Sequence, residues 1–205
     1  MKKTLLHRSL FVSTVALASG LILSCNNSSD SSKSADSTSN TTTTVSPAEN
    51  TSGTQTAVAT ITGTEADTTV EGTATFTQEG SGNTKLDLSV TVPKLANKTI
   101  AVHIHEHPDC GMMGKNTHGH WNPTNKPHGK FGTGDFHSGD IGNVTLDANG
   151  KGTLTMDTDL WTIGGDSTKN IVNRAIIVHS GTDDYKTQPT GNAGSRIGCG
   201  VIEKK

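Results

Sequence analysis

Hydrophobic and polar side chains alternate along most of the chain after Thr56. The clearest run has Leu86, Leu88, Val90 and Val92 separated by polar residues. A period of two places the apolar side chains on one face of a β-strand and the polar ones on the other. Seven other short runs share the pattern, so we expect eight strands. They lie near residues 57–63, 70–76, 85–92, 99–105, 141–146, 152–158, 175–179 and 197–202.

The composition and the connections favour an all-β fold, either a sandwich or a flattened barrel. Aromatic residues make up only 3% of the chain and there are 23 glycines, which disfavours a helical bundle. Asn149 and Gly150 both tolerate positive φ and lie between two expected strands, so they predict a hairpin turn. The segment from Glu106 to Gly139 has no periodicity, and a loop of that length needs something else to order it. A metal ion or a disulfide would do so.

The N-terminus resembles an export signal. Lys2, Lys3 and Arg8 precede an apolar stretch at 10–23. The stretch is short and interrupted, whereas a membrane-spanning helix needs roughly 20 apolar residues. The four residues ending at Cys25 resemble a bacterial lipobox, in which the cysteine is lipidated and becomes the mature N-terminus. The alternative is a secreted protein in which Cys25 belongs to the leader.

Three segments follow from this pattern: a lipoprotein signal peptide at 1–24, a flexible Ser/Thr/Asn-rich tether at 25–55 and a folded domain at 56–205. The tether has too few large apolar side chains to offset the entropy of ordering it. We expect an exported protein of the periplasm or cell envelope, held at a membrane through a lipid on Cys25. The net charge is -2. No basic stripe is present to neutralise phosphates, so we expect no nucleic-acid partner.

Eight of the nine histidines fall between His103 and His179. His103 and His105 are two residues apart on an expected strand, so their side chains project from the same face. Two imidazoles on one face can hold one metal ion.

A second set of potential ligands lies on the long loop. It consists of His120, His128, His137 and Asp140, and three imidazoles with a carboxylate suit zinc. An ion here would organise a loop that has few apolar residues. The alternative is a solvated histidine-rich loop, but such a loop would have no need of Asp140.

Several ordered motifs resemble the copper/zinc superoxide dismutase family, and the resemblance runs from about Thr56 to the C-terminus. The motifs are His103-Ile104-His105-Glu106, Gly119-His120-Trp121-Asn122-Pro123, Lys126-Pro127-His128-Gly129, His137-Ser138-Gly139-Asp140-Ile141-Gly142-Asn143, Ile177-Val178-His179 and the run from Gly191 to Gly200. The resemblance implies an eight-stranded Greek-key β-barrel or sandwich, immunoglobulin-like, with long metal-binding loops.

The resemblance also implies a role for each matching residue. The implied copper ligands are His103, His105, His120 and His179. The implied zinc ligands are His120, His128, His137 and Asp140, so His120 would bridge the two ions. Asp183 matches an aspartate that ties a copper-ligand imidazole to a zinc-ligand imidazole, and carboxylates of this kind orient the ligands. The alternative for Asp183 is an ordinary surface acid, as Asp184 is expected to be.

Arg196 resembles the family's anion-guiding arginine, a permanent cation near the copper site. A generic ion-pair partner is the alternative. Between His179 and Arg196 the sequence has only Lys186 as a further cation, so the source of steering beyond Arg196 stays open. His107 and His118 have no counterpart among the family's ligands, and we expect them to be exposed. Transient metal capture is the alternative.

The resemblance further implies a disulfide between Cys110 and Cys199. It implies an enzyme with copper and zinc as cofactors and superoxide as substrate. Superoxide would be converted to dioxygen and hydrogen peroxide by alternate reduction and reoxidation of copper. The catalytic side chains would be His120 and Arg196, and a homodimer is possible. The rival function is a tethered module that binds or buffers copper or zinc without turnover. An adhesive β-sandwich would leave the clustered histidines unexplained.

Overall fold

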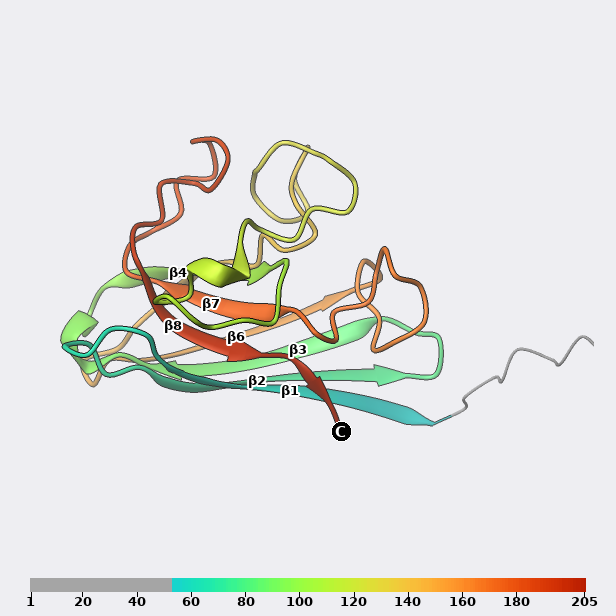
Figure 1. The fold of residues 1–205 in the computed structure, drawn as a ribbon, viewed down its shortest axis with the longest axis horizontal. Helices are drawn as coiled ribbons and strands as arrows, with labels where there is room; N and C mark the ends of the chain where they lie inside the picture. Colours follow the sequence, from blue (N-terminus) through green and yellow to red (C-terminus); the bar gives the residue numbers. More distant parts are fainter. Residues whose placement is uncertain (1–52) are drawn as a thin grey trace, which may run out of the picture. The chain divides into compact units, whose positions relative to one another are not determined.

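The computed structural model describes residues 53–205, whose regular structure is almost entirely β-strand (Figure 1). The predicted signal peptide, Cys25 and nearly all of the predicted tether lie outside the described residues. The strands are β1 (Thr54–Gly63), β2 (Glu71–Glu79), β3 (Thr84–Thr91), β4 (Thr99–His105), β5 (Gly142–Thr145), β6 (Lys151–Thr158), β7 (Ala175–His179), β8 (Arg196–Val201) and β9 (Glu203–Lys204). Two short 3-10 helices, Pro93–Leu95 and Lys115–Thr117, complete the regular structure. Within residues 53–205, no helix is long and apolar enough to span a membrane.

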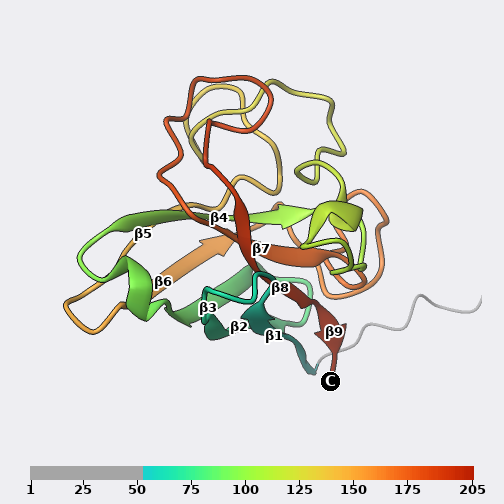
Figure 2. The same cartoon turned by 60° about the vertical axis from the view of Figure 1, so that its left-hand side comes forward.

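The strands form one antiparallel sheet that curls into a nearly closed barrel (Figure 2). The strand order is β5-β4-β7-β8-β1-β2-β3-β6, and β9 pairs with β1. Strand β4 therefore lies between β5 and β7, although β3 precedes it in the sequence. The predicted all-β fold with eight strands is confirmed. The additional strand, β9, is a two-residue continuation beyond β8.

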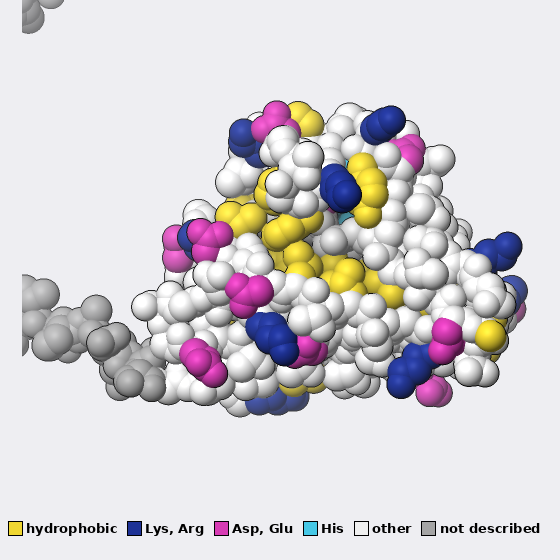
Figure 3. Space-filling view, turned by 180° about the vertical axis from the view of Figure 1, so that it is seen from behind, with side chains coloured by type: hydrophobic (Ala, Val, Ile, Leu, Met, Phe, Trp, Pro, Cys, Tyr) yellow, Lys and Arg dark blue, Asp and Glu magenta, His cyan; other side chains and the backbone are white. Residues whose placement is uncertain are grey.

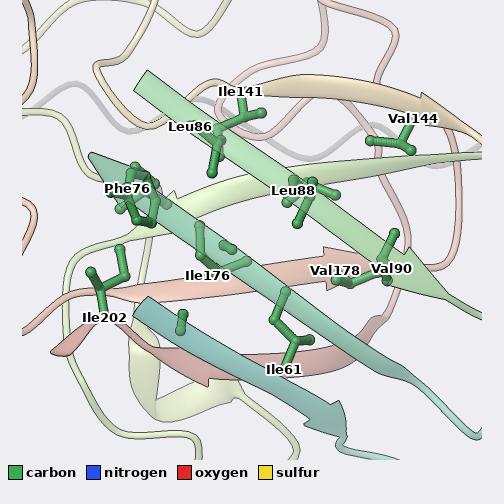
Figure 4. Packing of buried hydrophobic residues seen from close by; sticks show 14 of the residues in the cluster. Ile61, Phe76, Leu86, Leu88, Val90, Ile141, Val144, Ile176, Val178 and Ile202 are labelled. Carbon is green, nitrogen blue, oxygen red and sulfur yellow. The ribbon is translucent and has the colours of Figure 1, made fainter. Parts of the chain in front are cut away.

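The alternating pattern fills the interior of the barrel. Figure 4 shows Leu86, Leu88 and Val90 of β3 pointing into the same apolar interior as Ile176 and Val178 of β7. All five side chains are buried. Burying a side chain of this size contributes about 1.5–3 kcal/mol, so the barrel is a stable scaffold for the loops attached to it.

The predicted hairpin at Asn149-Gly150 is only half right. The chain does turn there, and Gly150 has the positive φ of 76° that the turn requires. However, β5 pairs with β4 and β6 pairs with β3, so the two strands that flank the turn share no ladder. The turn instead joins β5 and β6, which stand at the two ends of the strand order. The sequence pattern identifies a tight turn but does not show which strands it joins.

Two long segments, 106–141 and 180–195, lie on the same side of the barrel next to β4 (Figures 1 and 2). On the face shown in Figure 3, acidic and basic side chains are interspersed around a band of apolar side chains. Charges on this face are therefore mixed in sign.

Candidate metal centre

The first two candidate ligands are placed by the pleat of β4. His103 and His105 project from one face of the strand, while Val102 and Ile104 project into the apolar core. Both histidines are completely buried. The β4–β7 ladder aligns His103 with Ile177, so its backbone is fixed by sheet hydrogen bonds.

His179 and His120 reach the same place from elsewhere in the chain. His179 ends β7, where an irregularity in the pairing with β8 follows Val178. Bulges of this kind redirect a side chain. His120 lies on the long loop and forms an isolated bridge with His105. The loop approaches β4 closely at Gly139, where a Cβ atom would lie 2.2 Å from the carbonyl oxygen of Ile104.

Two groups of four side chains result, each with its ligand atoms within 4.8 Å of one another. We call His103, His105, His120 and His179 the strand group, and His120, His128, His137 and Asp140 the loop group. Both groups are buried and they share His120. The ring centroid of His120 lies 4.0 Å from that of His103 and 5.3 Å from that of His128. The predicted copper and zinc ligands are thus brought together in the two expected sets.

Asp140 is the anionic centre of the loop group. Its Oδ1 lies 2.7 Å from His120 Nδ1 and 3.2 Å from His137 Nδ1, and its Oδ2 lies 3.0 Å from His128 Nδ1. Burial opposes ionisation of this carboxyl, but the three neighbouring imidazoles outweigh it and hold the pKa of Asp140 below its usual range. The carboxylate is therefore charged at neutral pH and supplies the negative ligand that zinc sites of this type use.

Asp183 connects the two groups. Its Oδ2 accepts a hydrogen bond from His103 Nε2 at 2.9 Å, and its Oδ1 accepts one from His128 Nε2 at 2.9 Å. Asn143 holds the aspartate through two reciprocal hydrogen bonds to its backbone. Gly191 permits the packing, because a Cβ there would lie 1.9 Å from Asp183 Oδ1. Burial disfavours the charge, but the two histidine hydrogen bonds overcome it and lower the pKa of the Asp183 carboxyl.

The residues present fit a pair of metal ions. Within residues 53–205, six buried imidazole nitrogens have no hydrogen-bond partner. They are His103 Nδ1, His105 Nε2, His120 Nε2, His128 Nδ1, His137 Nδ1 and His179 Nε2. An unpaired buried polar atom costs about 1–3 kcal/mol, so six of them in two clusters require a compensating ligand. Imidazole suits both copper and zinc, and the carboxylate of the loop group suits zinc.

The protonation states of the strand-group histidines agree with ligation. Burial lowers the pKa of His105 and of His179 well below the usual value. Burial also lowers the pKa of His120 to about 4, although its hydrogen bond to Asp140 acts in the opposite direction. Neutral imidazoles at pH 7 have a free lone pair, which is the form that binds metal.

Arg196 lies beside the strand group, because the β7–β8 pairing sets it opposite His179. Its Nη1 donates to Gly114 O at 2.7 Å and to Thr117 Oγ1 at 3.0 Å, and its Nη2 donates to His118 O at 2.6 Å. These bonds fix a permanent cation in one orientation.

An open surface cavity of about 420 Å³ lies at this arginine. It is lined by Glu65, Met113, Lys115, Gly194, Ser195 and Arg196. Lys115 belongs to the long segment 106–141, so a search of the sequence for cations between His179 and Arg196 misses it. Lys186, the cation found by that search, is not among the lining residues.

Gln188 is a second residue that sequence reasoning misses. Its side chain accepts a hydrogen bond from His128 N at 2.8 Å and donates one to His128 O at 2.9 Å. It therefore holds the backbone of a loop-group histidine from a segment 60 residues away. Nothing in the local sequence around Gln188 indicates this contact.

Cys110 and Cys199 form a disulfide, as the resemblance implied. Cys110 belongs to the long loop and Cys199 to β8, so the bond ties the loop to the barrel. The tie is close to Arg196, which precedes Cys199 by three residues on the same strand.

Comparisons with known proteins agree with this arrangement. The family model for copper/zinc superoxide dismutase (SODC) matches residues 70–202. The copper-zinc superoxide dismutase 2 of Aquifex aeolicus is 37% identical over 110 residues, which are 52% of this chain and 64% of that protein. The extracellular copper-zinc superoxide dismutase of Caenorhabditis elegans is 35% identical over 133 residues, 62% of this chain and 58% of that protein.

The fold comparison gives a related result. The crystal structure of the clock protein EA4 superposes with a TM-score of 0.63 at 32% identity, covering 72% of this chain and 93% of that one. This chain therefore spans less than two thirds of the two curated relatives but nearly all of the solved structure. Because the family model covers more than half of the sequence and contains both ligand groups, the chain belongs to the copper/zinc superoxide dismutase family.

Proposed function

We propose that this protein is a superoxide dismutase that converts two superoxide anions and two protons to dioxygen and hydrogen peroxide. The observation that carries the proposal is the single imidazole of His120, which belongs to both four-residue groups. A protein that only stored metal would have no need to join two different ligand sets through one ring. The family membership and the named activity of the relatives support the same function.

We assign copper to the strand group and zinc to the loop group. Copper would supply the one-electron chemistry by cycling between two oxidation states, while zinc, which has no redox chemistry, would set the position and basicity of the shared ring. The strand group offers only neutral nitrogen donors, whereas the loop group adds the Asp140 carboxylate. Asp183 fixes the rings of His103 and His128 through their Nε2 atoms, which leaves Nδ1 of each ring free for an ion.

His120 also has the geometry to handle a proton. Its Nδ1 contacts Asp140, and its Nε2 is buried without a partner among residues 53–205. Since Nε2 is the nitrogen available to the strand group, we expect the proton to be held and released at this atom. Delivery of this proton, together with a second proton from solvent, would convert reduced superoxide to hydrogen peroxide.

The arginine and the lysine of the surface cavity would attract and orient the anionic substrate. Arg196 is held by three backbone or side-chain oxygens and is charged at every physiological pH. Lys115 adds a second cation to the cavity lining, while Glu65 partly offsets them. Local positive potential of this kind raises the association rate of an anion even where the net charge of the protein is negative.

We further propose that the enzyme is exported and held at a membrane by a lipid on Cys25. The extracellular designation of the Caenorhabditis elegans relative supports export, as does the Cys110–Cys199 disulfide, because disulfides persist in oxidising compartments. The mass of the mature N-terminal peptide tests the anchor. A diacylglycerol adduct on Cys25 supports it, and an unmodified peptide that starts elsewhere contradicts it.

The activity is tested with full-length protein loaded with one copper and one zinc ion per chain, as verified by elemental analysis. Superoxide decay followed by pulse radiolysis should give a second-order rate constant of about 10⁸–10⁹ M⁻¹s⁻¹. In H120A this catalysis should be lost, while circular dichroism shows an intact fold. Stoichiometric binding of both ions without turnover in the wild type would instead favour a metal-buffering module.

A further inference from the structure

A third cluster of potential ligands lies at the surface, just beyond the end of β4. It consists of Glu106, His107 and His118, whose ligand atoms all lie within 4.8 Å of one another. The imidazoles of His107 and His118 are exposed, with ring centroids 4.5 Å apart and an interplanar angle of 83°. The cluster shares no residue with the strand group or the loop group. None of its three side chains has a part in the proposed dismutase chemistry.

The backbone places these side chains together. Glu106 N donates to Gly119 O at 3.1 Å, and His107 N donates to Thr117 O at 3.2 Å. The two segments therefore run side by side and hold His118 next to His107. Backbone hydrogen bonds between the two segments therefore hold the cluster together.

The conformation of His118 makes its identity informative. Its φ is 60° and its ψ is -140°, a region that glycine occupies without strain and other residues rarely adopt. Holding a non-glycine residue there costs on the order of 1–3 kcal/mol. The backbone alone would thus favour glycine at this position. A histidine at this position is explained if its side chain binds a ligand.

The ligand atoms of the cluster are available. Within residues 53–205, the hydrogen bonds made by these three residues use their backbone atoms. His118 O accepts from His105 Nδ1 and from Arg196 Nη2, and Glu106 O accepts from Arg174 Nη1. The two imidazoles and the carboxylate can therefore converge on a ligand without breaking an existing side-chain hydrogen bond.

We propose that Glu106, His107 and His118 form a third metal site, for a divalent transition-metal ion of the zinc type. Two imidazoles and one carboxylate are a recurrent protein donor set for zinc, with solvent completing the coordination at an open site. Because the imidazoles are exposed, the ion would exchange with solvent, unlike ions in the two buried groups.

The site is connected to the strand group by one carbonyl oxygen. His118 O accepts hydrogen bonds from His105, a strand-group histidine, and from Arg196. An ion held by the His118 imidazole would therefore fix the residue whose backbone positions both side chains. The third site is independent of the dismutase proposal, because its occupancy can be measured whether or not the protein turns over superoxide.

The test is a calorimetric titration with Zn²⁺ of full-length protein whose two buried sites are already filled. Wild-type protein and E203Q, which removes an exposed carboxylate far from the cluster in sequence, should bind one further equivalent with the same affinity. In the H107A/H118A double variant and in E106Q that equivalent should weaken by at least about tenfold, since even outer-shell partners contribute ~10- to 100-fold to metal affinity. Elemental analysis beforehand confirms that each variant retains its two buried ions.

Two results would overturn the proposal: no further equivalent in the wild type, or an equivalent of unchanged affinity in H107A/H118A. Should the double variant fail to retain its buried ions, H107Q gives the same comparison, because it leaves the unusual backbone at His118 untouched. Loss of the further equivalent in H107Q supports the site, and retention at full affinity rejects it.

Discussion

Replacing Asp183 by alanine removes a side chain that hydrogen-bonds one histidine of each ligand group. The carboxylate is completely buried and accepts one hydrogen bond from His103 Nε2 and one from His128 Nε2, each at 2.9 Å. The two histidines depend on it to different degrees. His103 is fixed by the β4–β7 ladder, whereas His128 lies on the long loop outside any strand, with its backbone held by the side chain of Gln188. We therefore expect D183A to disturb the loop group more than the strand group.

The magnitude follows from the bonds that are lost. A hydrogen bond to a charged group contributes about 1.5–3 kcal/mol, and one such bond orients the metal-binding nitrogen of His128. At about 1.4 kcal/mol for each tenfold change in affinity, the loss corresponds to roughly a 10- to 100-fold weaker loop-group ion. For the strand group we expect a smaller loss, because the backbone of His103 stays in place when the carboxylate is removed.

Competition with a chelator of known zinc affinity measures this effect on D183A, and elemental analysis gives the copper retained in the same samples. The matched control is D184A, because Asp184 is exposed and its carboxylate accepts hydrogen bonds from Lys186 and Thr187 of its own loop. D184A should keep wild-type affinity for both ions. Equal weakening of both ions in D183A, or no weakening of zinc, would refute the reasoning.

Three further predictions concern stability and steering. Replacing both Cys110 and Cys199 by serine opens a loop with a sequence separation of 89 residues. In the metal-free protein this should lower the free energy of unfolding, measured in urea, by about 2–5 kcal/mol. An unchanged midpoint of urea unfolding would contradict this. Removing both ions with a chelator should lower the midpoint of thermal unfolding by at least about 8 °C. The reason is that a ligand that binds only the native state adds about 4 kcal/mol of stability at 1,000 times its Kd. Identical midpoints by calorimetry would argue against two ions that bind the native state. K115Q should slow dismutation about two- to fivefold at low salt and hardly at all near 1 M salt, because salt screens electrostatic steering. The control is K151Q, whose lysine lies outside the Arg196 cavity and whose rate should match the wild type. A K115Q effect that persists in high salt would exclude steering.

Much of the barrel could be predicted from the sequence because the period-two pattern reports burial directly. The run of Leu86, Leu88 and Val90 lies on β3 with all three side chains inside. The same pleat rule placed His103 and His105 on one face. Pairing could not be predicted in this way. The turn at Gly150 has the local chemistry of a hairpin, yet the strands on either side of it pair elsewhere in the sheet.

The candidate site was predictable where the motifs carried the information. The two ligand groups follow from histidines with recognisable neighbours, and the structure brings them together around His120. Lys115 and Gln188 act across long sequence separations, so no local signal shows that one lines the Arg196 cavity and the other holds His128. Contacts of this kind depend on how the loops fold over the barrel, which requires the tertiary structure.

The central claim is that the ring of His120 is shared by two different ions. Anomalous diffraction from crystals of the protein loaded with copper and zinc, recorded at the absorption edge of each metal, tests it most directly. The account predicts one copper peak among the strand-group nitrogens, one zinc peak among the loop-group ligands, and the His120 imidazole between them. A single peak, or two peaks of which one makes no contact with His120, would contradict it.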